Sequence, residues 1–332
     1  MAEVKRFCGQ KFQNRNLTGG NRENREKMND SSDREAGPSG RNREWNERTP
    51  LPNPLPAPRG EGIGESLGGD CNIGDKGAAI ARVNVLGVGI SAINMDRALA
   101  AIAGAVERRE KGYICVTGVH GVSEAQTDEG FREILNRAFL CTPDGMPLVW
   151  AGRWQGWKEM GRVYGPDLME AVMELSEKKG YRHFFYGGSN GVAKALGEEL
   201  VKRFPKVQIA GSYEPPFRPL NAGEEAELKR LIRETQPDMM WIGLSTPKQE
   251  RFMAEHLGQL DVTLMAGVGA AFDIHAGRLR QAPRWMRRSG LEWLFRLCCE
   301  PRRLWKRYFK NNPLFVIRIF CQATGLKKYR LT

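Results

Sequence analysis

The chain has 332 residues, of which 41% are hydrophobic, which is enough for one large domain or two ordinary ones. Its seven cysteines form no C-x-x-C pair and no His/Cys ligand spacing, which excludes a disulfide framework and a zinc site and indicates a reducing compartment. No stretch approaches the roughly 20 apolar residues that cross a bilayer, and residues 1–16 lack the apolar core of a signal peptide, so we expect neither a membrane-spanning nor a secreted protein.

The positive charge is concentrated near the C-terminus. The net charge is +12, and residues 278–332 alone hold 15 Lys and Arg against two acidic residues. The remaining 277 residues hold 36 Lys and Arg against 37 acidic residues, so they are close to neutral. A charge so localised predicts one anionic partner surface rather than general solubility.

Residues 1–78 are rich in Asn, Arg, Glu, Gly, Ser and Pro, and five prolines fall within residues 49–58. Such a composition cannot bury enough apolar surface to offset the entropy lost on ordering. We therefore predict a disordered extension over residues 1–78.

Between residues 79 and 277, short apolar runs alternate with amphipathic stretches. Several runs are continuously apolar, as in strands that are covered on both faces. The alternation predicts an α/β catalytic domain with a Rossmann-like, mostly parallel sheet flanked by helices. The expected strands are 83–87, 113–117, 139–141, 183–186, 207–213, 239–242 and 262–265, and the expected helices are 94–110, 122–137, 146–153, 166–179, 190–204, 222–235 and 247–257.

The first expected strand is followed by Gly87-Val-Gly89, a partial match to a dinucleotide-binding fingerprint. The match keeps a nucleotide-dependent oxidoreductase open as an alternative function. That function needs an acidic residue at the end of the second strand to hold ribose. Here the second strand ends in Thr117-Gly118, so the match is weak.

Ligands of such sheets gather beyond the carboxyl ends of the strands. Thr117 ends the second expected strand and Asp144 follows the third, so the two can face one crevice. A carboxylate at this place can act as a general base, whereas the alternative is that Asp144 caps the helix that follows it. His120 is a candidate acid/base group or, equally, a hydrogen-bonded residue at a helix start.

Three later strand ends also carry candidate ligand groups. Gly187 and Gly188 link a strand to a helix, so their amides can approach an anion such as diphosphate, although a tight turn also explains them. Lys248 and Gln249 lie at a helix start, where Lys neutralises phosphate and Gln hydrogen-bonds a base or a sugar. Asp273 is a further polar group just after a strand.

Residues 278–332 interleave basic and aromatic side chains. At helical spacing, Trp305, Tyr308 and Phe309 share an apolar side, and Lys306 and Lys310 mark a basic one. Because a basic amphipathic helix with tryptophans is typical of membrane-surface binding, we predict a helical appendage that associates with anionic membrane. Two alternatives stay open: a segment that binds single-stranded nucleic acid, and a helix that packs on its own domain.

A series of motifs, taken in order, resembles the WecG/TagA/CpsF family of bacterial glycosyltransferases (glycosyltransferase family 26). Each motif is weak alone, but their order makes the resemblance specific over about residues 83–308. The motifs are Thr142-Pro-Asp-Gly-Met146, Arg162-Val-Tyr-Gly-Pro-Asp-Leu168, Tyr186-Gly-Gly188, Pro247-Lys-Gln-Glu250, Gly267-Val-Gly-Ala-Ala-Phe-Asp273, Ala282-Pro-Arg-Trp-Met286, Gly290-Leu-Glu-Trp-Leu294 and Glu300-Pro-Arg-Arg-Leu304.

The resemblance implies an inverting glycosyltransferase that uses neither a metal nor another cofactor. It would move a hexose or N-acetylhexosamine (glucose or a ManNAc-type sugar) from a UDP-sugar to a saccharide on a polyprenyl diphosphate. The reaction would take place at the cytoplasmic face of the membrane, in surface polysaccharide synthesis, with no nucleic-acid partner. Consistent with a metal-free reaction, the sequence contains no Asp-x-Asp pair.

The resemblance also assigns roles to residues. They are Asp144 as the base, Thr117 lining the cleft, Arg162 binding sugar or phosphate, Gln249 holding the donor, and Arg296, Arg303 and Lys306 approaching the diphosphate groups. The chain departs from the family at the second strand end, where many members have Thr-x-Asn and this sequence has Thr117-Gly118-Val119. His120 is the candidate substitute for the missing amide.

Overall fold

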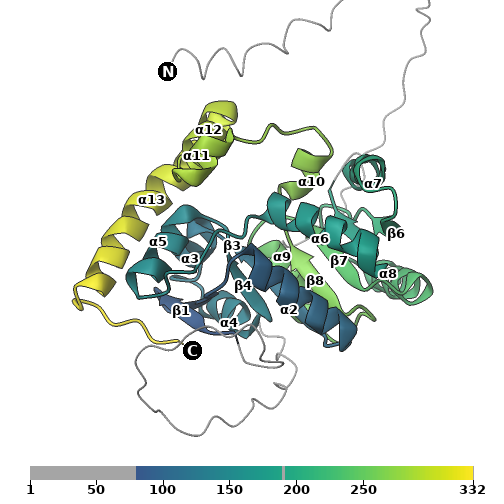
Figure 1. The fold of residues 1–332 in the computed structure, drawn as a ribbon, viewed down its shortest axis with the longest axis horizontal. Coiled ribbons are helices and arrows are strands. Elements are labelled where there is room, and N and C mark those ends of the chain that lie inside the picture. Colours follow the sequence, from purple (N-terminus) through teal and green to yellow (C-terminus); the bar gives the residue numbers. More distant parts are fainter. Residues whose placement is uncertain (1–79, 189–190, 332) are drawn as a thin grey trace, which may run out of the picture. The chain divides into compact units, whose positions relative to one another are not determined.

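The computed structural model describes residues 80–188 and 191–331 (Figure 1). The disordered extension predicted for residues 1–78 lies outside the described residues. No helix in the described part is both long and apolar enough to cross a membrane.

The centre of the fold is a six-stranded parallel sheet with strand order β4-β3-β8-β7-β5-β6. The α/β, mostly parallel sheet predicted from the sequence is therefore confirmed, and each expected strand end is right to within two residues. The strands are β3 (Gly112–Thr117), β4 (Leu140–Pro143), β5 (Arg182–Gly187), β6 (Gln208–Tyr213), β7 (Met239–Gly243) and β8 (Leu264–Gly267).

Helices cover both faces of the sheet, because successive residues of each strand point to opposite sides. In β7, Met239 and Trp241 join the core cluster on one face, and Met240 and Ile242 join the cluster on the other. The first cluster includes residues of α2 (Met95–Glu107), α6 (Gly165–Lys179), α7 (Val192–Arg203) and α10 (Ala271–His275). The second includes residues of α3 (Val119–Glu124), α4 (Glu129–Arg137), α8 (Ala222–Thr235) and α9 (Lys248–His256).

The strand expected at residues 83–87 is instead the start of a separate antiparallel hairpin, β1 (Arg82–Val85) with β2 (Val88–Ser91). Its two-residue turn is Leu86-Gly87, and both residues have positive φ, 54° and 83°. That geometry matches the right-handed twist of the strands. Gly87 and Gly89 therefore lie in a hairpin and do not open a helix, since α2 begins only at Met95. The prediction that Gly87 and Gly89 form a dinucleotide-binding site is therefore wrong.

The helix expected over residues 122–137 is two helices, α3 and α4, with a break at residues 125–128. The side chain of Asp128 accepts a hydrogen bond from the amide of Phe131 at 2.9 Å, which caps the start of α4. Asp128 therefore begins a new helix within a stretch whose apolar spacing looks continuous.

The C-terminal segment folds into α11 (Arg284–Arg288), α12 (Glu292–Cys299) and the long α13 (Pro301–Ala323), which runs past α3 toward the hairpin (Figure 1). One side of α13 is buried through Leu304, Asn311 and Phe315. At its end, Gln322 accepts from the amide of Leu86 at 2.8 Å and donates to the carbonyl of Asn84 at 2.9 Å. The basic segment is thus fixed to the α/β domain along the length of α13.

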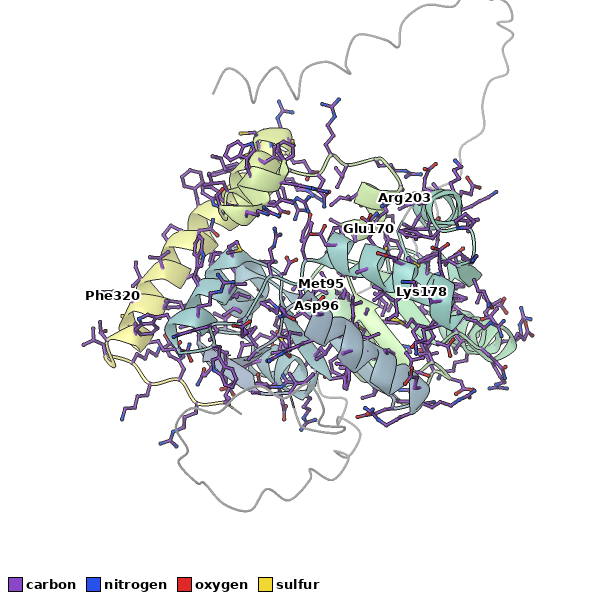
Figure 2. The ribbon with its side chains drawn as sticks, viewed as in Figure 1. Met95, Asp96, Glu170, Lys178, Arg203 and Phe320 are labelled. Carbon is purple, nitrogen blue, oxygen red and sulfur yellow. The ribbon has the colours of Figure 1, made fainter. Side chains whose placement is uncertain are left out.

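The opposite side of α13 is exposed and aromatic. Trp305, Phe309, Val316 and Phe320 are 49%, 70%, 65% and 62% exposed, and their spacing places them along one face of the helix. Exposed basic side chains accompany the first half of this row, at Arg302, Arg303, Lys306 and Lys310. We call Trp305, Phe309, Val316 and Phe320 the outer row of α13; Figure 2 shows Phe320 pointing away from the domain.

The two sides of α13 predict opposite effects of removing a phenylalanine ring. Phe315→Ala should lower the free energy of unfolding by about 3 kcal/mol, because it leaves a cavity in the core beneath α13. Phe320→Ala, the matched control on the outer row, should change it by less than about 0.5 kcal/mol. Denaturant titration measures both, and equal effects would contradict this orientation of the helix.

Candidate functional site

The ends of β3 and β4 place Thr117 beside Asp144. The register pairs Thr117 with Pro143, and the amide of Asp144 donates to the carbonyl oxygen of Thr117 at 3.0 Å. The Thr117 side chain is buried, and its hydroxyl donates to Cys115 O and accepts from Cys141 Sγ, each at 3.3 Å. The hydroxyl is therefore directed into the protein, and it is the Thr117 backbone that supports Asp144.

The carboxylate of Asp144 lies at the start of α6, where its Oδ1 accepts the amide of Gly165 at 3.3 Å. The N-terminus of a helix carries partial positive charge and favours a carboxylate. By contrast α5 (Met146–Trp154), the helix that follows Asp144, has Gly145 at its N-cap and no side-chain cap. The alternative that Asp144 caps the helix after it is wrong.

Gly165 connects this end of the sheet to the neighbouring strand ends. A Cβ on Gly165 would lie 3.3 Å from the carbonyl oxygen of Val268, just beyond β8. One residue further, a Cβ on Gly269 would lie 3.5 Å from Oε1 of Gln249. Asp144 and Gln249 therefore both lie at the carboxyl ends of the strands, with the loop after β8 between them.

Arg162 holds the loop after β4 to the C-terminal segment. Its Nε donates to the backbone oxygen of Asp144, its Nη1 to the backbone oxygen of Arg287 at 3.3 Å, and its Nη2 to the carboxylate of Glu292. The guanidinium also stacks over the ring of Tyr164, 4.2 Å from its centroid. The side chains of Arg162 and Glu292 are only 15% and 13% exposed, so water screens this ion pair weakly.

Burial raises the pKa of Asp144 from its ordinary 3.8 to about 6. The nearby Arg162 lowers that pKa and Glu292 raises it, while the Gly165 amide and Arg296 lower it further. A carboxylate with a pKa near 6 is largely ionised at neutral pH and is still a stronger base than an exposed aspartate. That combination suits a general base.

Arg296, on α12, completes the charged surroundings of Asp144. Burial opposes its charged form, but Tyr308, Tyr164, Glu292 and Asp144 together raise its pKa. Arg296 also lines a cavity of about 30 Å³ with Tyr164, Glu292 and Phe295. A space of this size holds about one or two water molecules, so a larger ligand can enter it only if side chains move.

The other two cations that the sequence selected from the C-terminal segment lie on the exposed start of α13. Arg303 pairs with Glu300 at 2.6 Å, and both affect Asp273, whose pKa is raised by burial, lowered by Arg303 and raised by Glu300. Lys306 is exposed and lies 5.7 Å from the ring centroid of Trp305. Asp273 is thus near Arg303, whereas Lys306 belongs to the exposed basic surface.

Gln249 is buried rather than exposed to a cleft. Its Nε2 donates to Glu250 Oε1 at 3.1 Å, and the Thr246 hydroxyl donates to the same oxygen at 2.9 Å. Gln249 Oε1 has no hydrogen-bond partner among the described residues. Lys248, one residue earlier, is exposed. At the start of α9, the Lys248 cation therefore faces solvent, and Gln249 Oε1, which accepts no hydrogen bond from the described residues, lies near the loop after β8.

Gly187 and Gly188 are explained by packing between two loops. A Cβ on Gly187 would lie 2.8 Å from the Gly243 carbonyl, and the amide of Gly188 donates to Gly243 O at 3.2 Å. Both glycines have positive φ, 116° and 75°. The Gly188 amide is therefore already used inside the protein.

His120 lies at the contact between α3 and α13. Its Nδ1 is 3.1 Å from Asn311 Nδ2 on the buried side of α13 and 3.6 Å from the Glu124 carboxylate. The structure thus places His120 where it links the C-terminal helix to the sheet domain.

Comparisons of the sequence with known proteins identify its family. A sequence model of the Glycosyl transferase WecG/TagA/CpsF family matches residues 83–329. The chain belongs to this family. It is therefore a glycosyltransferase, and the alternative function of a nucleotide-dependent oxidoreductase is wrong.

Two relatives illustrate the similarity. The chain is 29% identical over 202 residues to the N-acetylglucosaminyldiphosphoundecaprenol N-acetyl-beta-D-mannosaminyltransferase of Bacillus subtilis (strain 168), which covers 61% of this chain and 76% of that protein. It is 27% identical over 218 residues to the enzyme with the same name from Staphylococcus aureus (strain NCTC 8325 / PS 47), which covers 65% of this chain and 82% of that protein.

Sequence reasoning did not select three side chains that contact Arg162 or Tyr164 near Asp144. They are Tyr164, under the Arg162 guanidinium; Arg287, which pairs with Asp167 at 2.9 Å; and Glu292. One signal pointed to Glu292, since it is one of only two acidic residues in the basic segment 278–332. An isolated carboxylate in a cationic segment often marks a specific ion pair.

The raised pKa of Asp144 predicts that Asp144→Asn stabilises the fold. The pKa of Asp144 is about 6 in the folded protein, against an ordinary value of 3.8. Ionisation of Asp144 therefore destabilises the folded state above pH 6, and this penalty is absent below about pH 4. The variant should be more stable at pH 8 by about 1–3 kcal/mol, with the difference shrinking as the pH falls toward 4.

Thermal and urea unfolding across this pH range would measure the effect. Asp261→Asn is the matched control. Asp261 lies before β8, at the amino ends of the strands, and forms an exposed ion pair with Lys111. An Asp144→Asn variant that is less stable than the wild type at pH 8 would contradict the raised pKa.

Proposed function

We propose that this glycosyltransferase moves an N-acetylhexosamine of the ManNAc type from a UDP-sugar to an N-acetylglucosaminyl diphosphate carried on a polyprenyl lipid. The names of the Bacillus and Staphylococcus relatives support the transferred sugar and the acceptor. The observation that carries the proposal is the carboxylate of Asp144, held at the strand ends beside Arg162 with a pKa of about 6.

In the proposed reaction an acceptor hydroxyl attacks the anomeric carbon of the donor sugar. The new bond joins the acceptor oxygen to that carbon, while the bond from the carbon to the UDP oxygen breaks and its electron pair leaves with UDP. Asp144 takes the hydroxyl proton as the bond forms. A single displacement of this kind inverts the anomeric centre.

The departing UDP develops negative charge, and cations of the C-terminal segment are available to stabilise it. Arg296 is partly buried next to Asp144, and Arg303 and Lys306 follow on the same segment. Charges fixed in a partly dry site stabilise such a transition state strongly. We therefore propose a metal-independent reaction in which these cations and Lys248 neutralise the diphosphate groups, and Gln249 contacts the donor.

A lipid-linked acceptor requires the enzyme to work at a membrane surface, and the outer row of α13 supports this. It presents aromatic side chains that are exposed to water, next to exposed Lys306 and Lys310. Amphipathic helices of this kind lie in the headgroup region of anionic membranes, and each cation near the surface contributes about 1 kcal/mol. We propose peripheral attachment at the cytoplasmic face through this row.

Replacing the base tests the reaction. Asp144→Asn should lower the turnover number by about 10²–10⁴-fold, because general-base catalysis is typically worth that factor. Release of UDP from UDP-ManNAc with a short-chain prenyl diphosphate GlcNAc acceptor measures it, and UDP binding should be nearly unchanged. Asp261→Asn is again the control. Nearly full turnover in the Asn variant, or strict dependence on added Mg²⁺ or Mn²⁺, would contradict the mechanism.

Replacing the outer row tests the attachment. The triple variant Trp305→Ser, Phe309→Ser, Phe320→Ser should bind anionic vesicles about a hundredfold more weakly, because three aromatic side chains each contribute on the order of 1 kcal/mol. Co-sedimentation with phosphatidylglycerol-containing vesicles measures it. The buried-side variant Phe315→Ala, where folded, should bind as the wild type does. Unchanged binding of the triple variant would remove the outer row as the attachment site.

A further inference from the structure

We infer that Glu292 is a positioning residue: from α12 it holds the guanidinium of Arg162 away from the carboxylate of Asp144, so that this carboxylate stays free to accept a proton. The inference deepens the proposed function and rests on it, since it concerns the same base. It assigns to the C-terminal segment an acidic side chain with a task distinct from that of its cations.

Three hydrogen bonds of Arg162 use each of its guanidinium nitrogens once. Nη2 donates to Glu292, Nη1 to the backbone of Arg287, and Nε to the backbone oxygen of Asp144. Each nitrogen has one of these acceptors, and none of the three bonds goes to the Asp144 carboxylate. The side chain is thus beside the base without occupying it.

A second contact fixes Glu292 in place. Burial and the neighbouring Glu292 carboxylate raise the pKa of Tyr164, and the ring centroid of Tyr164 lies 4.2 Å from the Arg162 guanidinium. Arg162, Tyr164 and Glu292 therefore form a closed triangle of contacts, and the triangle forms only when α12 is docked on the domain.

The position of Arg162 matters because arginine and carboxylate groups form strong bidentate pairs when they are free to do so. Such a pair would occupy the oxygens of Asp144 that must receive the proton, and it would lower the pKa of the base. Glu292 competes for the same guanidinium and prevents that pairing. A charged side chain that binds substrate can then lie next to the base.

The charges around Asp144 show what loss of Glu292 would do. Facing Asp144 are Arg162 and Tyr164 from the loop before α6, the Gly165 amide of α6, and Glu292 and Arg296 from α12. With Glu292 present, two carboxylates face two guanidinium groups. With Glu292 neutral, two guanidinium groups face Asp144 alone, and the acceptor of Arg162 Nη2 is no longer charged.

The test is the pH dependence of turnover in Glu292→Gln. In the wild type the acidic limb of kcat against pH should lie near pH 6, because Asp144 must be ionised. In the variant the limb should move to lower pH by about one pH unit or more, the size expected for one close charge. Glu292→Asp, which keeps the charge, should keep the limb closer to that of the wild type.

A purely structural role for Glu292 would lower activity without moving the limb, so an unmoved or raised limb in a folded, active Gln variant overturns the inference. Glu170→Gln is the matched control, since Glu170 is also a helix carboxylate paired with an arginine, Arg203, and both lie between α6 and α7 (Figure 2). It should leave the limb in place.

A second measurement works without turnover and separates the two proposals. The ¹³C carboxyl signal that is missing from Asp144→Asn titrates near pH 6 in the wild type and should titrate lower in Glu292→Gln. If the Gln variant does not fold, Glu292→Asn takes its place, with the same expectation. An inactive wild type would overturn the proposed function, whereas an unshifted Asp144 signal would overturn the inference about Glu292.

Discussion

A single guanidinium, that of Arg162, joins the loop after β4 to the C-terminal segment, which lies far along the sequence. It donates to the backbone of Asp144 after β4, to the backbone of Arg287 in α11 and to the carboxylate of Glu292 on α12. Because the donors of arginine form a rigid planar fork, meeting all three acceptors fixes their relative positions. The C-terminal segment is thereby held over the strand ends, with Arg296 on the next turn of α12. The electrostatic surroundings of Asp144 depend on this docking.

Most of the sheet could be predicted from the sequence, because buried parallel strands are continuously apolar and the helices between them are amphipathic. The failures have local causes. The turn at Leu86-Gly87 contains a leucine with positive φ, a conformation that its side chain disfavours and that no sequence pattern announces. The break before α4 depends on the Asp128 cap, and the apolar spacing continues across it.

The site was predictable only in part, and the reasons are geometric. The strand-end rule correctly brings Asp144 and Thr117 together, but it leaves open where each side chain points. Residues two apart in a strand face the same side, so Thr117 shares the side of Cys115, which is fully buried. That alternation explains why its hydroxyl binds Cys115 O and Cys141 rather than facing outward. The role of Glu292 could not be predicted, because its partner Arg162 lies 130 residues earlier in the sequence.

The charge of the C-terminal segment differs sharply from that of the rest of the chain and predicts an appendage, yet α13 contacts the sheet domain at both ends and in the middle. The buried Phe315 side chain and the hydrogen bonds of Gln322 fix the orientation of α13 about its axis. The outer row therefore faces away from the domain. Only Glu300 separates α12 from α13, so there is no flexible linker between the outer row and Glu292. A loose tail would bring its cations to the donor for only part of the time. With the helix fixed, the side chains that would meet the membrane and those that surround the base keep a constant relation, and a lipid-borne acceptor would approach Asp144 from one direction.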